Sequence, residues 1–408
     1  MKFDIFFSIC QAKIDGVMPS ERKMFDNFFD QVTLADSLGF DTAWIAESHL
    51  SSEVQKKNLR PVIPNFSGEV GLNTDILQLA YGVYSRTKRI TVGSAIKNIL
   101  CNGGPLAQAE AIKTFLSLKK HSSHQARRIK LGFASGRFEY SNRPFGIRPR
   151  NELEQAVWSI LKGKIFQEAT EVFLKSLRGD VFSSKDIRAK KITSNDFRED
   201  KKWEAVKETY KHELCDDFSQ EYFAFQSFWE FETLKIIPQE PSLDDIDFYL
   251  GSHDPSTQVL ANSVLPCRVF NLSITPSKTI KETHQRMSAL YEQKGLSWHR
   301  EYMPRTVLVF VDNDPLLSDH QRNKRAKEYA SKVLSQYWKA LVGTLDTKKI
   351  QQAVDNALYG CPKQVAMQLK ERFHPKDCLM LWFDFYCHDN KQVKNSMKTF
   401  VEEVVPLV

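Results

Sequence analysis

The sequence of 408 residues lacks the features that mark several classes of protein. No apolar run approaches the roughly 20 residues that cross a bilayer. Residues 1–9 are too short for the charged-then-apolar order of a secretory signal. The seven cysteines are scattered, and no two of them have the spacing of a zinc or redox motif. We therefore expect no membrane partner and a reduced, cytoplasmic setting.

Motifs of several other classes are also missing. No HExxH or comparable histidine spacing occurs, so no metal site is predicted. GxSxG is absent, and no GxGxxG follows the first expected strand, which argues against a dinucleotide-binding open sheet. The net charge is only +7, and charge is concentrated only around residues 185–202, where the signs alternate. We interpret that stretch as solvated, with no nucleic acid as partner.

What the sequence does contain is an alternation of strand-like and helix-like segments. Strand-like runs lie at 3–9, 42–46, 90–96, 129–134, 223–237, 248–250, 269–274, 306–311 and 379–383. Helical patterns lie at 21–38, 75–85, 107–118, 153–166, 277–294, 321–341, 362–373 and 391–405. The alternation predicts an α/β fold with a parallel sheet. An eight-stranded barrel is favoured over an open doubly wound sheet, as a single domain over 1–408. A charged stretch of low periodicity at 178–220 is predicted to be an insertion after the fourth strand–helix unit.

The stretch GFDTAWIAESHL, residues 39–50, contains the first candidate site. A short apolar run at 42–46 is followed at once by Glu47, Ser48 and His49. We expect these residues at the carboxyl end of a parallel strand, where α/β barrels place their chemistry. A histidine beside a carboxylate can act as a general base. In the alternative interpretation, Glu47 pairs with an arginine or caps a backbone donor, and His49 only packs.

The loop GSHDPST, residues 251–257, precedes a helical stretch. The hydroxyls of Ser252, Ser256 and Thr257 suit an anion at a helix N-terminus. Asp254 or Ser256 can equally be a plain helix cap with no ligand, and capping alone is favoured at this point.

The loops at 132–140 and 97–105 are further candidates. In GFASGRFEY, Gly136 allows close approach of backbone to a ligand, and Arg137 offers a planar fork of donors. A tight turn with a solvated arginine is the alternative. In KNILCNGGP we expect a flexible loop, and Cys101 has no partner that would make it a nucleophile.

These segments, in their order, resemble the bacterial luciferase-like flavin-dependent monooxygenases. The resemblance rests on MKFDIFFSICQ, GFDTAWIAESHL, KRITVGSAI with NGGPLAQAE, IKLGFASGRFEYSNRPFGI, GSHDPST, YGCPKQVAMQL and MKTFVEEVVPLV. It implies a (β/α)₈ TIM barrel that holds reduced FMN, or in some branches the deazaflavin F420. Such enzymes add O₂ to the flavin and transfer one oxygen to an organic substrate. The resemblance also implies a separate flavin reductase and a homodimer.

The resemblance assigns expected roles to residues of this chain. Glu47 and His49 match its catalytic positions, whereas Ser48 stands in place of the family's first histidine. Ser135 and Ala107 replace arginines. These departures keep two alternatives open, namely a flavin-binding protein without turnover and an F420-dependent oxidoreductase. The substrate is not predicted beyond a small organic molecule. The expected cofactor-binding residues are Ser94, Ala95, Ser135, Gly136, Arg137, Ser252, His253, Ser256 and Thr257.

Overall fold

The computed structural model describes residues 1–58, 65, 67–136, 138–188, 190–197, 199–214, 221–341, 348, 352 and 355–408. Parallel strands form one sheet, in which each strand pairs with the next and β13 pairs with β1. A single parallel bridge between Asn271 and Arg305 joins the two remaining neighbours, β10 and β11. The predicted barrel is therefore confirmed. Its strands are β1 (Lys2–Phe7), β3 (Thr42–Ile45), β5 (Thr91–Asn98), β6 (Ile129–Ala134), β9 (Ile246–Leu250), β10 (Cys267–Val269), β11 (Arg305–Val311) and β13 (Cys378–Trp382).

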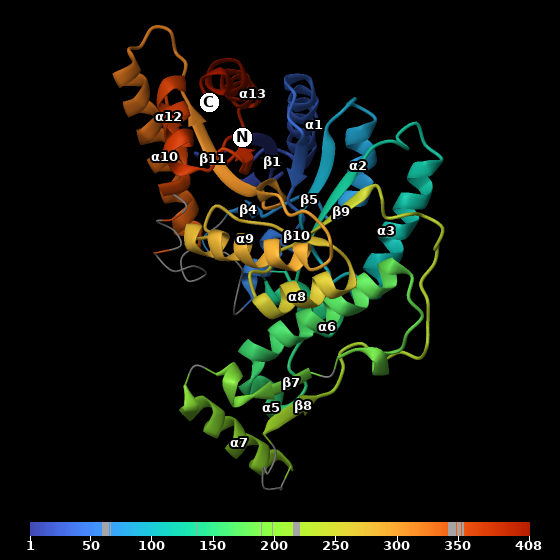
Figure 1. Cartoon of the computed structure of the whole chain (residues 1–408). Helices are drawn as coiled ribbons and strands as arrows, with labels where there is room; N and C mark the ends of the chain where they lie inside the picture. The colour runs from blue at the N-terminus through green and yellow to red at the C-terminus, as the bar shows by residue number, and fades with distance from the viewer. Residues whose placement is uncertain are drawn as a thin grey trace.

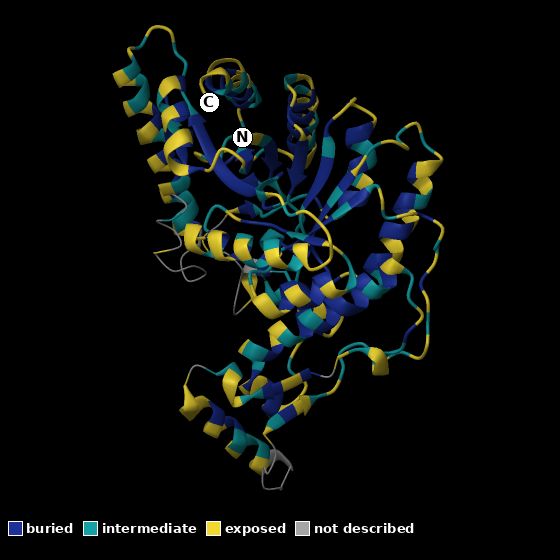
Figure 2. Ribbon diagram, in the orientation of Figure 1, coloured by how far each residue is buried: buried dark blue, intermediate teal, exposed yellow. Residues whose placement is uncertain are grey.

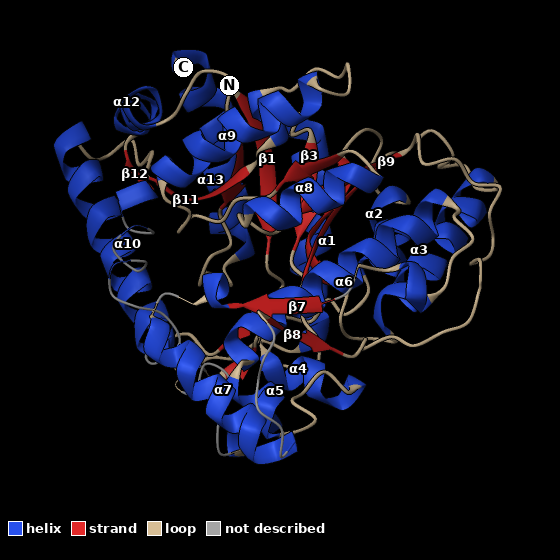
Figure 3. Ribbon diagram, turned by 60° about the horizontal axis from the view of Figure 1, so that its bottom comes forward, coloured by secondary structure: helices blue, strands red, loops and turns tan. Residues whose placement is uncertain are grey.

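Helices surround these strands (Figures 1 and 3). Helix α1 (Glu21–Leu38) shows why they form where they do. The hydroxyl of Ser20 caps its N-terminus, and the helix ends at Gly39, which has φ 89°. Its buried residues recur at helical spacing and face the strands (Figure 2). The helices are α1 (Glu21–Leu38), α2 (Ile76–Tyr84), α3 (Gly104–Lys120), α6 (Trp158–Arg178), α8 (Pro255–Val264), α9 (Ser277–Glu292), α10 (Asp319–Leu341), α12 (Pro362–Arg372) and α13 (Asn390–Thr399). None of the described helices is apolar over enough of its length to cross a bilayer.

Aromatic side chains fill the barrel. The ring of Trp44 packs edge-on against those of Tyr249 and Phe270, with centroids 4.9 and 5.3 Å apart. Its indole Nε1 donates to Asp4 at 2.7 Å. Gly93 of β5 faces this indole, and a Cβ there would lie 2.6 Å from it. The interior is therefore closed beneath the carboxyl ends of the strands.

The chain between α6 and β9 departs from the alternation. It contains the antiparallel pair β7 (Lys190–Thr193) and β8 (Tyr222–Phe225) and the helix α7 (Asp200–Leu214). With α5 (Glu152–Ala156) they form a projection at the bottom of Figure 1, away from the termini. The expected strand-like run at 223–237 is wrong in extent, since β8 ends at Phe225 and, beyond it, Leu234 forms only an isolated bridge with Phe182. The low periodicity predicted over 178–220 is wrong for α7, in which the side chains of Trp203 and Val206 are buried.

Short elements complete the fold. β12 (Leu358–Gly360) pairs with the end of β11, and β2 (Gln11–Ala12) pairs with β4 (Gly68–Glu69). A short helix, α4 (Glu139–Asn142), follows β6.

Candidate active site at the carboxyl ends of the strands

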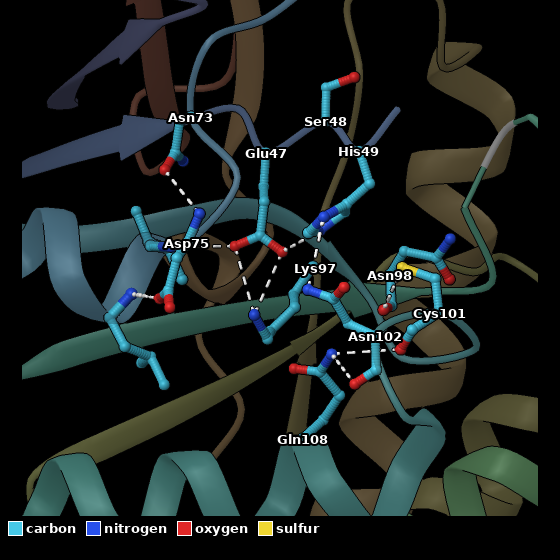
Figure 4. A network of polar contacts seen from close by, with 12 residues as sticks. Glu47, Ser48, His49, Asn73, Asp75, Lys97, Asn98, Cys101, Asn102 and Gln108 are labelled. Atoms are coloured by element: carbon cyan, nitrogen blue, oxygen red, sulfur yellow. Dashed lines mark hydrogen bonds and ion pairs between the residues drawn. The ribbon is translucent and has the colours of Figure 1, made fainter. Parts of the chain in front are cut away.

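Glu47 lies directly after β3 and is the centre of a buried polar network (Figure 4). Its carboxylate accepts from Lys97 Nζ at 3.2 and 3.3 Å and from the amide of Ile76 at 3.1 Å. The ring Nε2 of His49 lies 3.0 Å from it. The Glu47 side chain has no exposed surface, and that of Lys97 is 4% exposed. A buried carboxylate thus has a cation and two further donors.

The charge of Glu47 is stabilised by these partners. Burial alone would raise the pKa of Glu47, but the Lys97 ammonium and the contact with His49 hold it below its ordinary value. Glu47 is therefore ionised at neutral pH, and Nε2 of His49 donates to it. The remaining ring nitrogen, Nδ1, is 3.5 Å from the amide nitrogen of Asn102. That distance leaves Nδ1 weakly held on the side of the ring away from Glu47.

Lys97 reaches the site because β5 is irregular. Its pairing with β6 shifts register between Ser94 and Lys97. Ile96, inside this irregularity, has φ 113°, which is strained for a β-branched residue. The extra residue in β5 reverses the face of the sheet on which the side chains that follow it lie. The predicted flexible loop at 97–105 is thus wrong at its start, since Lys97 and Asn98 belong to β5.

The loop after β5 is anchored. Gln108 of α3 donates to the carbonyls of Cys101 and Asn102 at 3.2 and 3.3 Å. Cys101 is buried, and burial, with the nearby charge of Glu47, raises the pKa of its thiol to about 12. The thiol therefore stays protonated at neutral pH.

A cavity of about 530 Å³ lies at the carboxyl ends of the strands. Its walls are mainly apolar, and Glu47 and His49 form part of one side. Six of the expected site residues line this cavity, and so does Ser48. Ser94, in contrast, is fully buried in β5 and does not line it. Arg137 lies outside the described residues. The lining residues are Glu47, Ser48, His49, Ala95, Ile96, Asn98, Ala134, Ser135, Gly136, Phe138, Ser141, Gly251, His253, Phe270, Leu272, Ile274, Thr275 and Pro276.

Gly136 and Asn98 shape the wall after β6. Asn98 Nδ2 donates to Asn142 at 2.6 Å, and Asn142 in turn donates to the carbonyl of Ser135 at 3.0 Å. Gly136 has φ +72°, and a Cβ there would overlap the Asn98 amide. Only glycine lets the backbone approach so closely.

A second cavity of about 400 Å³, the side cavity, shares Ser135 and Gly136 with the first. Ser252, Ser256 and Thr257 line it, as does Asp254, which caps α8. The helix cap that the sequence of this loop favoured is therefore present, at Asp254. Binding of an anion by the hydroxyls stays a prediction.

Sequence reasoning missed several residues that the structure brings to the site. Lys97 and Asn98 were expected in a loop, and no local pattern marked Asn102, Asn142 or Phe270. The position of Lys97, directly after the strand-like run at 90–96, is the sequence signal that could have pointed to its place in the site.

Comparisons with known proteins agree with this geometry. Residues 1–182 match the family model for luciferase-like monooxygenases. A search of curated proteins found no match. The resemblance noted in the sequence is thus confirmed over the part of the chain that holds Glu47, His49 and the wall at Ser135 and Gly136.

Solved structures share the fold over the full length. The monooxygenase RslO1 of Streptomyces bottropensis is 14% identical, with a TM-score of 0.65 and coverage of 100% of this chain and 99% of its own. The oxygenating constituent of 3,6-diketocamphane monooxygenase from Pseudomonas putida, in complex with FMN, is 14% identical with a TM-score of 0.57, covering 100% and 98%. An F420-dependent secondary alcohol dehydrogenase is 13% identical with a TM-score of 0.53, covering 100% and 99%.

Proposed function

We propose that this protein is a flavin-dependent monooxygenase that uses a reduced flavin and O₂ to oxygenate a small organic substrate. The observation that carries the proposal is the apolar cavity at the carboxyl ends of the strands, in a chain whose N-terminal part matches the luciferase-like family. A volume of about 530 Å³ is in the range of cofactor and ligand sites. The flavin, when bound, supplies the activation of O₂.

The residues of the chain provide a dry and rigid site for such a flavin. Ala95, Ala134 and Gly251 leave space for a planar ring, and Ile96 and Phe270 exclude water from it. Glu47 and Lys97 neutralise each other at one side, so they add no net charge to the cavity. The Nδ1 lone pair of His49 is the candidate acceptor for a proton from the substrate.

Several finer points belong to the proposal. The resemblance implies FMN, and a similar structure holds FMN, whereas another is F420-dependent. A separate reductase would supply reduced flavin, and we propose a cytoplasmic homodimer. We also propose the whole chain as a single barrel domain, with 178–220 as its insertion. The replacements at Ser48, Ser135 and Ala107 keep a flavin-binding protein without turnover as the alternative.

The test is an anaerobic titration of the purified protein with dithionite-reduced riboflavin, FMN and F420, followed by admission of O₂. We expect tight binding of a flavin, and O₂-dependent oxygenation within a panel of uncharged organic substrates. A protein that binds none of the three would contradict the proposal. Binding with no consumption of substrate across the panel would favour the alternative without turnover. His49→Gln is expected to leave binding within about threefold and to lower turnover by about 10²–10⁴-fold.

A further inference from the structure

The side cavity carries an excess of negative charge among its described lining residues. Its two lysines are already paired: Lys162 Nζ lies 2.8 Å from Glu139, and Lys164 Nζ lies 3.0 Å from Asp196. Asp254 has no cationic partner within the described part of the chain. Among the residues that the structure describes, a phosphate placed here would therefore meet an unbalanced carboxylate rather than a free cation.

The carboxylate of Asp254 also accepts hydrogen bonds from donors of Ser256 and Thr257 that a phosphate would use. One of its oxygens accepts from the hydroxyls of Ser256 and Thr257, both at 2.6 Å, and from the amide of Thr257 at 2.7 Å. Gln167 adds its amide at 3.3 Å. The hydroxyl of Ser252 accepts from the amide of Asp254 at 3.2 Å. The hydroxyls of Ser256 and Thr257 and the amide of Thr257, at the N-terminus of α8, are thus engaged by the chain itself.

The loop has little positive charge to offset Asp254. Although burial alone would raise the pKa of Asp254, the hydrogen bonds from Ser256, Thr257 and Gln167 hold it below its ordinary value, so the group is ionised at neutral pH. Burial, with the charge of Arg286, lowers the pKa of His253, which is neutral there. Arg286 itself approaches from α9, bonds to Gln258 and Thr283, and lines neither cavity.

We propose that this site selects a flavin whose side chain is an uncharged polyol, as in riboflavin, over a flavin with a phosphorylated side chain, as in FMN. This inference rests on the proposed function, in which the ring of the flavin binds in the larger cavity. The side chain would pass Ser135 and Gly136, which both cavities share, into the side cavity. Hydroxyl groups donate hydrogen bonds to carboxylates, so a polyol suits a cavity lined by Glu139, Asp196 and Asp254.

The experiment compares the affinities of reduced riboflavin and reduced FMN for the full chain, under anaerobic conditions. We expect riboflavin to bind at least about tenfold more tightly than FMN, because the repulsion between the carboxylate and the phosphate acts in a partly enclosed site. Asp254→Asn keeps a good helix cap but removes the charge. It is expected to tighten the binding of FMN about tenfold and to give riboflavin no gain in affinity, because the polyol loses a charged acceptor.

Asp389→Asn is the matched control. Asp389 caps α13, where it accepts from the amides of Lys391 and Gln392, and it lines neither cavity. Its removal takes away the same charge and should leave both affinities unchanged. Tighter binding of FMN than of riboflavin by the unaltered chain, or no gain for FMN in Asp254→Asn, would overturn the inference. Failure of every flavin to bind would overturn the proposed function instead.

Discussion

Replacing Lys97 by Met tests the interpretation of the buried network most directly. The substitution keeps a long apolar stem and removes the ammonium that lies 3.2 Å from Glu47. Of its partners in the described part of the chain, Glu47 would retain the amide of Ile76 and the ring of His49. Breaking a buried pair by removing one partner typically costs about 3–5 kcal/mol, and we expect a loss of that size in the free energy of unfolding at pH 8.

The pH dependence of that loss has a definite sign. In the unaltered chain the pKa of Glu47 is lowered, so its contribution is present above the unfolded value of about 4.3 and is lost as the pH falls through the lower folded value. Without Lys97, an ammonium no longer offsets the effect of burial, and the pKa of Glu47 rises. The destabilisation of Lys97→Met is therefore expected to be larger at pH 8 than at pH 5. Urea unfolding followed by tryptophan fluorescence at both pH values measures it.

Two further variants of the chain make the test specific. Lys332→Met breaks an exposed pair, in which Lys332 and Asp15 are 56% and 63% exposed, and it should cost less than about 1 kcal/mol. The double variant Glu47→Gln with Lys97→Met should recover about 1–3 kcal/mol relative to the sum of the single losses. Additive losses, or a stability of Lys97→Met within about 0.5 kcal/mol of the unaltered chain at pH 8, would refute the reasoning.

Other positions give further predictions. Gly136→Ala should weaken reduced-flavin binding by about tenfold or more, because its Cβ would displace Asn98; Gly146→Ala, at φ +83° with open space around it, is the control and should leave binding unchanged. Burial raises the pKa of Asp384 to about 7, so the fold keeps a proton that the unfolded chain releases near pH 4. Stability should therefore fall between about pH 4 and pH 7, and Asp384→Asn should flatten that dependence in urea titrations; equal slopes would show that Asp384 is ionised in the fold. Asp36→Ala should cost at least about 2 kcal/mol, since its carboxylate accepts from the amides of Lys88, Arg89 and Ile90; a loss below about 0.5 kcal/mol would contradict this.

The barrel was predictable because its local signals agree with one another. The first helix was expected at 21–38 and spans Glu21–Leu38, since its cap, its apolar spacing and its terminal glycine all indicate the same bounds. The short run before Glu47 forms β3, and this placed Glu47 and His49 at the cavity. The helix α7 was missed although Trp203, Val206 and Tyr210 follow helical spacing, because many charged residues surround them.

The rest of the site depends on contacts that local patterns do not encode. Lys97 faces Glu47 only because β5 changes register, and periodicity assumes that no such irregularity exists. Asn98, at the end of β5, and Asn142, at the end of α4, come together from 44 positions apart in the chain. At the loop 251–257, the sequence showed both hydroxyls and a carboxylate, but only the structure shows that the hydroxyls of Ser256 and Thr257 donate to Asp254.

The single bridge between β10 and β11 has a consequence for how molecules enter the barrel. At this seam two backbone hydrogen bonds, from Asn271 to Pro304 at 2.9 Å and from Thr306 to Asn271 at 3.2 Å, replace a full ladder. Phe270 and Leu272, on either side of Asn271, belong to the cavity wall. The Asn271 side chain adds hydrogen bonds to the carbonyls of Met303 and Pro304 at 3.1 and 3.4 Å. Opening the seam requires all of these bonds to part, while the Glu47 side keeps its continuous strand pairing. The hydrogen-exchange rates of the Asn271 and Thr306 amides in heavy water thus measure how often the barrel opens at this seam, a route by which a substrate would enter.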